Sequence, residues 1–336
     1  MSPPLLAVED LAVEISTPRG TVHAVDGVSF SVDHGEAMGL VGESGCGKTM
    51  TLLSILGLLP RGAEVIAGRI LLEGQDLLKL DRRAMRDVRG TVLSMIFQEP
   101  MVALNPVMRV GTQISEGLIA HQGVSRGLAH ERALELMRLV GIPDEQRRAK
   151  VYPHELSGGM RQRVMIGLAL ACRPKLILCD EPTTALDVTV QDQVIKLLAQ
   201  LCSDFGVSLV YVTHDLAVVA QLCQRLCVMY AGQIVETGTV GQLFREPRHP
   251  YTLGLLRAVP DHLVIRESLV SIPGSPPDLR APPAGCRFAS RCFLVQPDCT
   301  EGLFPLKGVD GQHMSACRYP QRCADAAEED PLISHA

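Results

Sequence analysis

The feature that most constrains this chain is a glycine-rich loop between two apolar stretches. Residues 42–49 read GESGCGKT, follow the apolar run 37–41 and precede the apolar stretch 52–56. This order predicts a strand, a loop and a helix. Because glycines let successive N–H groups point inward and the helix N-terminus adds partial positive charge, such a loop can hold a polyphosphate. The residues expected to line it are Gly42, Ser44, Gly45, Cys46, Gly47, Lys48 and Thr49.

Lys48 and Thr49 close the loop with two groups that a bound nucleotide needs. The Lys48 ammonium is expected to reach the β- and γ-phosphates of ATP, and the Thr49 hydroxyl to ligate Mg²⁺. The alternative is a glycine turn that arose by chance. The strand predicted before the loop and the helix predicted after it favour phosphate binding over that alternative.

The composition is that of a folded chain without a broad polyanion-binding surface. The chain has 336 residues, of which 46% are hydrophobic, which suits one large or two modest domains. Its formal net charge is −5 and it has no long run of Lys or Arg, so no nucleic-acid partner is indicated. The N-terminus shows no signal-peptide pattern, and the apolar stretches are short of a bilayer span. We therefore expect a cytosolic chain that reaches a membrane only through partners.

The N-terminal third of the chain has the patterns of short strands. Residues 5–15 and 22–32 alternate apolar and polar residues around a turn at 17–20, which predicts antiparallel strands. Residues 68–74 predict another short strand, and residues 94–98 a buried strand that ends in Gln98. A small antiparallel sheet of this kind could pack beside the nucleotide.

Helical spacing replaces the strand pattern from about residue 101 to residue 165, for example in residues 131–140, which end at a Gly-Ile-Pro stop signal. We interpret this region as a helical subdomain inserted into an α/β domain. Apolar strands return at residues 175–181 and 208–215, each after a helix-like segment. The alternation predicts an α/β fold with a parallel sheet, whose loops gather at the carboxyl ends of the strands.

Polar residues suited to nucleotide hydrolysis are predicted at those strand ends. Gln98, Asp180, Glu181 and His214 are all expected on the edge that carries the glycine loop. Asp180 can hold Mg²⁺, Glu181 can orient or polarise an attacking water, and His214 can reach the γ-phosphate. Each also has a plainer alternative: a strand-ending cap for the two carboxylates, a solvent-facing histidine, and a polar cap for Gln98. The intact glycine loop favours the catalytic interpretation.

A second glycine motif, LSGGMRQR at residues 156–163, begins a helical pattern. Ser157 suits an N-cap, which is the alternative without function. Gly158 and Gly159 would allow a phosphate to approach the backbone closely at the helix N-terminus. One complete phosphate loop and one separate anion-binding helix start are explained if two copies meet face to face, each completing the ATP site of the other.

Together these motifs resemble the full series of an ABC-transporter ATPase over roughly residues 4 to 240. In that family's terms they are Walker A at 42–49, the Q-loop at Gln98, the signature at 156–162, Walker B at 176–181, the D-loop Ala185-Leu186-Asp187 and the H-loop at His214. Three further segments, at 97–106, 180–189 and 247–252, are similar to dipeptide/oligopeptide importers, a group that includes nickel and glutathione importers. Within it, the chain most resembles dipeptide-permease subunits that work beside a homologous second ATPase.

The resemblance implies a role for each motif residue. Glu181, His214 and Gln98 would be catalytic, while Thr49, Gln98 and Asp180 would hold Mg²⁺. Ser157, Gly158 and Gly159 would contact the ATP held mainly by a partner subunit. Many members of the family stack an aromatic ring on adenine ahead of the first strands. This chain has Arg19 there, whose guanidinium plane can also stack.

The end of the chain combines a proline-rich linker with crowded cysteines. We predict an ABC nucleotide-binding domain at residues 1–260 and a cysteine-rich C-terminal extension at 261–336. Its cysteines Cys286, Cys292, Cys299 and Cys317 include no close Cys-x-x-Cys pair, which argues against a zinc finger. They are either unligated buried thiols or ligands of one shared group. The segments 285–292 and 317–320 resemble the importers' C-terminal motif, where some members hold a [4Fe–4S] cluster, and this implies such a cluster here.

These features predict an ATP-hydrolysing subunit that powers import of dipeptides or short oligopeptides through a membrane permease. The resemblance implies as partners a homologous second ATPase subunit in a heterodimer, two transmembrane permease subunits and a substrate-binding protein outside the membrane. It places the chain at the cytoplasmic face of the inner membrane, as a peripheral protein. The alternatives are a nickel, glutathione or other small-solute importer, and a soluble ABC mechanoenzyme that acts on nucleic acid or ribosomes.

Overall fold

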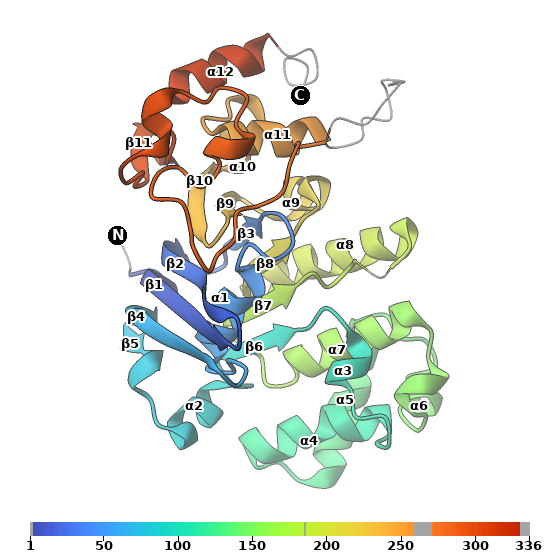
Figure 1. Ribbon diagram of the computed structural model, residues 1–336. Helices are drawn as coiled ribbons and strands as arrows, with labels where there is room; N and C mark the ends of the chain where they lie inside the picture. Colours follow the sequence, from blue (N-terminus) through green and yellow to red (C-terminus); the bar gives the residue numbers. More distant parts are fainter. Residues whose placement is uncertain (1–2, 185, 259–270, 330–336) are drawn as a thin grey trace. The chain divides into compact units, whose positions relative to one another are not determined.

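The computed structural model describes residues 3–184, 186–258 and 271–329 of the chain (Figure 1). The described residues form two compact units. The first unit takes them from Met1–Leu5, Val32–Ala37 and Leu77–Val212, and the second from Leu6–Ser31, Met38–Asp76 and Thr213–Ala336. Across the described ranges, no helix combines the length and the apolar character needed to cross a bilayer.

The second unit contains a small antiparallel sheet near the N-terminus. Its strands β1 (Leu6–Thr17), β2 (Gly20–Val32), β4 (Ala63–Leu72) and β5 (Gln75–Asp76) stand in the order β2-β1-β4-β5. β1 runs antiparallel to β4, with Leu6 opposite Leu72 and Ile15 opposite Ala63. The antiparallel prediction is confirmed. β4 begins five residues before the predicted Gly68, because its backbone still pairs with β1 where its side chains are mostly at the surface.

A second sheet region of this unit mixes parallel and antiparallel pairs. β3 (Ala37–Val41) lies parallel to β9 (Arg225–Tyr230), and β10 (Gln233–Thr239) lies antiparallel to β9. Beyond β10 come β12 (His313–Ser315) and β11 (Lys307–Asp310), both antiparallel to their neighbours. The prediction of a parallel sheet was therefore incomplete. The strands from β9 onward are joined by short turns or added from the C-terminal segment, and neither connection requires parallel pairing.

Helices α1 (Lys48–Leu56), α9 (Leu216–Leu222), α10 (Val240–Arg245) and α11 (Pro250–Ala258) complete this part of the second unit. The C-terminal segment adds the short helices η3 (Ala289–Arg291) and η4 (Pro297–Thr300) and the helix α12 (Pro320–Glu328). Cys323 and Ala327 of α12 pack against Leu253 of α11 in a small buried cluster. The predicted domain boundary between residues 260 and 261 lies outside the described residues.

The first unit carries three parallel strands, as predicted. β6 (Leu93–Ile96), β7 (Leu176–Asp180) and β8 (Ser208–Thr213) pair in that order, with Leu93 opposite Leu176 and Leu176 opposite Ser208. β7 and β8 are buried along their whole length, which matches strands covered on both faces. β6 is shorter than predicted: it ends at Ile96, and Gln98 follows two residues later.

Helices make up the rest of the first unit. They are η1 (Leu77–Lys79), α2 (Arg82–Val88), α3 (Pro100–Ala103), α4 (Val110–Gln122), α5 (Arg126–Leu139), α6 (Glu145–Arg148), η2 (Pro153–Glu155), α7 (Gly158–Leu170) and α8 (Val188–Phe205). Helices α4, α5 and α7 pack on one another (Figure 1). The predicted stop after residue 140 is confirmed, since α5 ends there and Gly141 takes a left-handed φ of 75°.

Candidate nucleotide and cysteine sites

The glycine loop joins β3 to α1 in a shape that depends on two of its glycines. The backbone of Gly47 has φ 108°, and a Cβ atom there would lie 2.4 Å from the carbonyl oxygen of Ala24. A Cβ at Gly42 would lie 2.1 Å from the carbonyl oxygen of Met229. Both distances are too short for any side chain. The predicted strand–loop–helix is therefore confirmed, together with the close packing that makes glycine necessary.

Lys48 points back over the loop that precedes it. The side chain is 5% exposed, and its Nζ donates hydrogen bonds to the carbonyl oxygens of Gly42, at 2.6 Å, and Glu43, at 2.9 Å. Gly47 stands at the N-cap of α1 and has no side chain that could cap it. A buried ammonium beside a helix N-terminus is the donor set that suits a polyphosphate. These residues therefore fit ATP, and the exposed Thr49 stands where a Mg²⁺ ligand is expected.

Two further predicted site residues lie in the second unit. Arg19 is exposed in the turn between β1 and β2, where its backbone N–H donates to Thr17 Oγ1 at 3.2 Å. His214 directly follows β8 and is exposed. The next residue, Asp215, caps α9 by accepting a hydrogen bond from the backbone N–H of Ala217 at 2.9 Å. Their proposed contacts with ATP stay predictions.

Asp180 is the last residue of β7 in the first unit, and Glu181 follows it directly. Asp180 is buried, with 5% of its surface exposed. Glu181 has a left-handed φ of 44°, its N–H donates to the Val212 carbonyl at 3.0 Å, and its Oε2 accepts from Thr184 Oγ1 at 3.0 Å. A non-glycine residue in this region costs about 1–3 kcal/mol, and such strain is concentrated at functional sites.

The signature motif and Gln98 share one cavity of the first unit. The cavity has a volume of about 210 Å³ and is lined by Gln98, Glu99, Pro100, Met101, Gly158, Arg161, Gln162, Pro182 and Leu186. Ser157 caps α7 by accepting from the Met160 N–H at 3.3 Å. A Cβ at Gly159 would lie 2.7 Å from Val190 Cγ1, so that glycine lets α7 approach α8. Ala185 of the predicted D-loop lies outside the described residues.

The four clustered cysteines line one small cavity of the second unit. Cys286, Cys292, Cys299 and Cys317 surround a space of about 20 Å³ together with Phe288 and other side chains. Burial, and to a lesser degree the neighbouring thiols, raises the pKa of Cys292 to about 11 and of Cys317 to about 12. These thiols are therefore protonated at neutral pH unless a metal displaces the protons.

The cysteine cavity has the donor set of an iron–sulfur site without its spacing. Four cysteine sulfurs suit a [4Fe–4S] cluster. Among the residues that the structure describes, however, no three His, Cys, Asp or Glu side chains stand close enough together to hold a metal ion. Cys323 lies on α12 and packs instead in the buried cluster with Leu253 and Ala327; burial raises the pKa of its thiol. The predicted cluster therefore lacks support from the geometry, although the four predicted ligands line the same space.

The C-terminal segment also contacts the glycine loop directly, a contact that was not predicted from the sequence. Arg291 is 4% exposed and binds Glu43 of the loop through two hydrogen bonds, Nη1 to Oε2 at 2.6 Å and Nη2 to Oε1 at 2.9 Å. The backbone N–H of Glu43 donates to Tyr251 Oη at 2.8 Å. Since Arg291 and Glu43 are 248 residues apart, no local pattern signals this contact.

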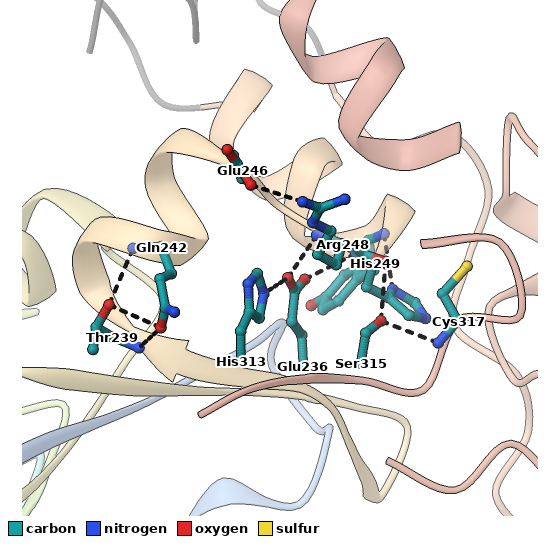
Figure 2. Close-up of polar contacts among 10 residues, drawn as sticks. Glu236, Thr239, Gln242, Glu246, Arg248, His249, His313, Ser315 and Cys317 are labelled. Atoms are coloured by element: carbon teal, nitrogen blue, oxygen red, sulfur yellow. Dashed lines mark hydrogen bonds and ion pairs between the residues drawn. The ribbon is translucent and has the colours of Figure 1, made fainter. Parts of the chain in front are cut away.

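A buried carboxylate ties the same segment to β10. Glu236 is fully buried and accepts hydrogen bonds from His313 Nε2 at 2.7 Å and from the backbone N–H groups of Arg248, at 2.6 Å, and His249, at 3.0 Å; Figure 2 shows them converging on it. His249 Nδ1 in turn accepts from the Tyr251 N–H at 3.1 Å. Burial lowers the pKa of His249 to about 3, so this imidazole is neutral.

The fold and the motif set define an ATP-binding cassette. The model of the ABC transporter family matches residues 25–184, and that of the oligopeptide/dipeptide transporter C-terminal region matches residues 235–299. A solved dimeric ATP-binding cassette in a post-hydrolysis state, bound to ADP and Pi, superposes with a TM-score of 0.64 and 26% identity, over 70% of this chain and 98% of that one. The chain is thus an ABC-type ATPase.

Comparison with curated relatives shows to which family of ABC-type ATPases this chain belongs. An oligopeptide transport ATP-binding protein of Bacillus subtilis is 51% identical over 92% of this chain and 87% of its own length. A probable peptide ABC transporter ATP-binding protein of Sinorhizobium fredii is 50% identical over 93% and 94%. A dipeptide transport ATP-binding protein of Escherichia coli is 46% identical over 94% and 97%. The chain therefore belongs to the ATP-binding subunits of the oligopeptide/dipeptide ABC transporters.

Proposed function

We propose that this chain hydrolyses ATP to drive the import of dipeptides or short oligopeptides through a membrane permease. The observation that carries the proposal is the glycine loop with its buried Lys48, present in a chain whose C-terminal region matches the oligopeptide/dipeptide transporters. The loop supplies nucleotide binding. The C-terminal match supports peptides as the transported substrate.

The chain's own residues divide the work on one nucleotide. Lys48 would leave the carbonyls of Gly42 and Glu43 and donate to the phosphates, which offer a stronger, charged acceptor. Thr49, Gln98 and Asp180 would hold Mg²⁺, which neutralises phosphate charge when bound. Glu181 would take the proton of the attacking water. The left-handed backbone of Glu181 supports this role, because residues in such strained conformations cluster at active sites.

Further residues would contact the γ-phosphate, the base and the nucleotide of a second subunit. His214 would contact the γ-phosphate, and the guanidinium of Arg19 would stack on the base. Ser157, Gly158 and Gly159 would contact the nucleotide of a second ATPase subunit, which we propose is a homologous chain in a heterodimer. The N-terminus of the thirteen-residue helix α7 favours a phosphate at that position.

Exposed apolar side chains beside Gln98 support docking to a permease. Met101, Val102 and Val107 are 42%, 78% and 80% exposed, and they follow Gln98 in the chain. We propose two transmembrane permease subunits and a substrate-binding protein outside the membrane as partners, and no nucleic acid. The chain would then be peripheral, at the cytoplasmic face of the inner membrane. Movement of the Gln98 cavity on ATP binding would reach the permease through this surface.

We further propose that residues 1–260 form the nucleotide-binding domain, with a helical subdomain at about 101–165, and that the cysteine-rich extension at 261–336 holds a [4Fe–4S] cluster. Cys286, Cys292, Cys299 and Cys317 would be its ligands, since all four line one cavity. Anaerobically purified chain should contain about four iron and four sulfide ions per molecule. One zinc ion per chain without iron would contradict the cluster.

The transport proposal is tested by the ATPase activity of the complex that this chain forms in detergent-solubilised membranes. Binding protein loaded with dipeptides should stimulate hydrolysis. The variant Glu181→Gln should retain ATP binding and lose turnover by about two to four orders of magnitude, the range for loss of a general base. Stimulation by nickel or glutathione instead of peptides would identify one of those solutes as the transported substrate. Near-normal hydrolysis by Glu181→Gln would remove that residue from the role of base.

A further inference from the structure

The Arg291 guanidinium joins the glycine loop to residues 272–273 and to Tyr230, whose Oη accepts from its Nη1 at 3.3 Å. Besides the two bonds to Glu43, Nε donates to the Pro273 carbonyl at 2.8 Å and Nη2 to the Ile272 carbonyl at 3.2 Å. The guanidinium also lies 5.7 Å from the ring centroid of Tyr230 and 5.9 Å from that of Phe288. A planar, five-donor cation is the side chain that can satisfy two carboxylate oxygens and two carbonyls at once.

Glu43 has four hydrogen-bonding partners, and two of them come from the C-terminal half of the chain. Arg291 binds its carboxylate and Tyr251 Oη accepts from its N–H. From within the loop, Lys48 Nζ and, at 3.3 Å, the Cys46 N–H donate to its carbonyl. If Lys48 turns to a phosphate, Arg291 and Tyr251 remain as the two partners of Glu43 from outside the loop.

Arg287 supports the other end of the loop through one intermediate. Its guanidinium is buried and binds the carbonyl of Ala231 and the carboxylate of Asp26. The next residue, Gly232, donates its N–H to the carbonyl of Cys46 at 2.9 Å. The two arginines lie next to Cys286 and Cys292 in the sequence. The cysteine-lined segment therefore contacts the loop directly at Glu43 and indirectly, through residues 231–232, at Cys46.

We propose that Arg291 is a positioning residue for nucleotide binding, through which the cysteine-rich segment sets the shape and charge of the phosphate loop. The inference rests on the proposed nucleotide site at that loop. Without Arg291, the Glu43 carboxylate would be uncompensated beside the place where phosphates bind. Its negative charge would repel the nucleotide, and the loop would lose one of its supports.

The test is the affinity of the purified full-length chain for a fluorescent, non-hydrolysable ATP analogue with Mg²⁺, measured beside the melting temperature. Arg291→Gln should weaken binding by about tenfold, the order expected when a buried, charge-assisted pair loses one partner. Arg291→Lys should bind the analogue more tightly than Arg291→Gln does, because lysine keeps the positive charge but lacks the paired N–H groups of the guanidinium. Arg280→Gln is the matched control, since Arg280 pairs with Asp278 at the surface of the same segment.

The double variant Glu43→Gln/Arg291→Gln separates positioning from simple stability. Removing the carboxylate along with its partner should bring the affinity back towards that of Glu43→Gln alone, so the two effects should not add. Arg291→Gln that binds the analogue within twofold of the wild type, or additive losses in the double variant, would overturn the inference. If Arg291→Gln does not fold, Arg291→Lys takes its place in a cycle with Glu43→Gln and the double variant Glu43→Gln/Arg291→Lys. Failure of the wild type to bind the analogue would instead contradict the proposed function.

Discussion

Single residues carry geometry that no other side chain could supply at the glycine loop. Gly47 combines a left-handed backbone with a neighbouring carbonyl that leaves no room for Cβ. The Lys48 ammonium is buried and donates to two neutral backbone carbonyls. It can exchange these hydrogen bonds for stronger ones to a charged phosphate. At this scale the motif is a set of steric and electrostatic conditions, each met by one residue type.

Substitution of Gly47 by alanine is expected to distort the loop. The new Cβ would lie 2.4 Å from the Ala24 carbonyl oxygen, so the loop must shift and nucleotide affinity should fall by at least tenfold. The backbone strain alone should lower the free energy of unfolding by about 1–2 kcal/mol. Chemical denaturation and analogue binding measure the two effects. Gly74→Ala is the control, because its φ is also left-handed, at 80°, but it has open space around it within the described residues. Equal analogue affinity in the two variants would contradict the steric argument.

Whole elements are joined by the buried carboxylate of Glu236. It lies on β10, accepts from His313 on β12 and from two N–H groups just before α11 (Figure 2). Ser315 continues the contact by donating to the Arg248 carbonyl at 2.9 Å and accepting from the Cys317 N–H at 3.1 Å. Glu236 therefore aligns a strand pair and a helix start, and Ser315 connects them to one wall of the cysteine cavity.

Replacement of Glu236 by glutamine should be strongly destabilising. One oxygen that accepts from an N–H or an imidazole would become an amide NH₂, which leaves a buried donor facing another donor. The expected loss in free energy of unfolding is about 3–5 kcal/mol, the range for breaking a buried charged network. Glu246→Gln, whose carboxylate is 57% exposed, should change it by less than about 1 kcal/mol. Denaturant titration of both variants decides the matter. A loss at Glu236 no larger than at Glu246 would show that the network contributes little.

At the scale of the whole molecule, the predicted nucleotide residues divide between the two units. The glycine loop, Arg19 and His214 belong to the second unit, whereas Gln98, Ser157, Asp180 and Glu181 belong to the first. The second unit also contains the cysteine cavity and the arginines that hold the loop. The cysteine-rich segment is thus part of the unit that contains the glycine loop, and its proposed cluster lies in the same unit as that loop.

The features that could be predicted from the sequence are those that depend on local patterns of residues. The loop between an apolar strand and a helix, the buried strands β7 and β8 and the end of α5 at Gly141 all depend on residues close together in sequence. Hydrophobic periodicity and glycine stops report such neighbours directly. Periodicity extended β6 too far, to Gln98, and did not predict β12, a three-residue strand too short for any period to show.

The ABC motif series, the α/β alternation and the four cysteines of the C-terminal segment follow from the amino-acid order, because each is a local arrangement of residue types. Three other features depend on how the chain folds. Arg291 contacts Glu43 across 248 residues, and His313 contacts Glu236 across 77. The Ala24 carbonyl leaves no room for a side chain at Gly47. Such pairs depend on the path of the whole backbone, and no sequence spacing encodes which distant groups that path brings within hydrogen-bonding distance.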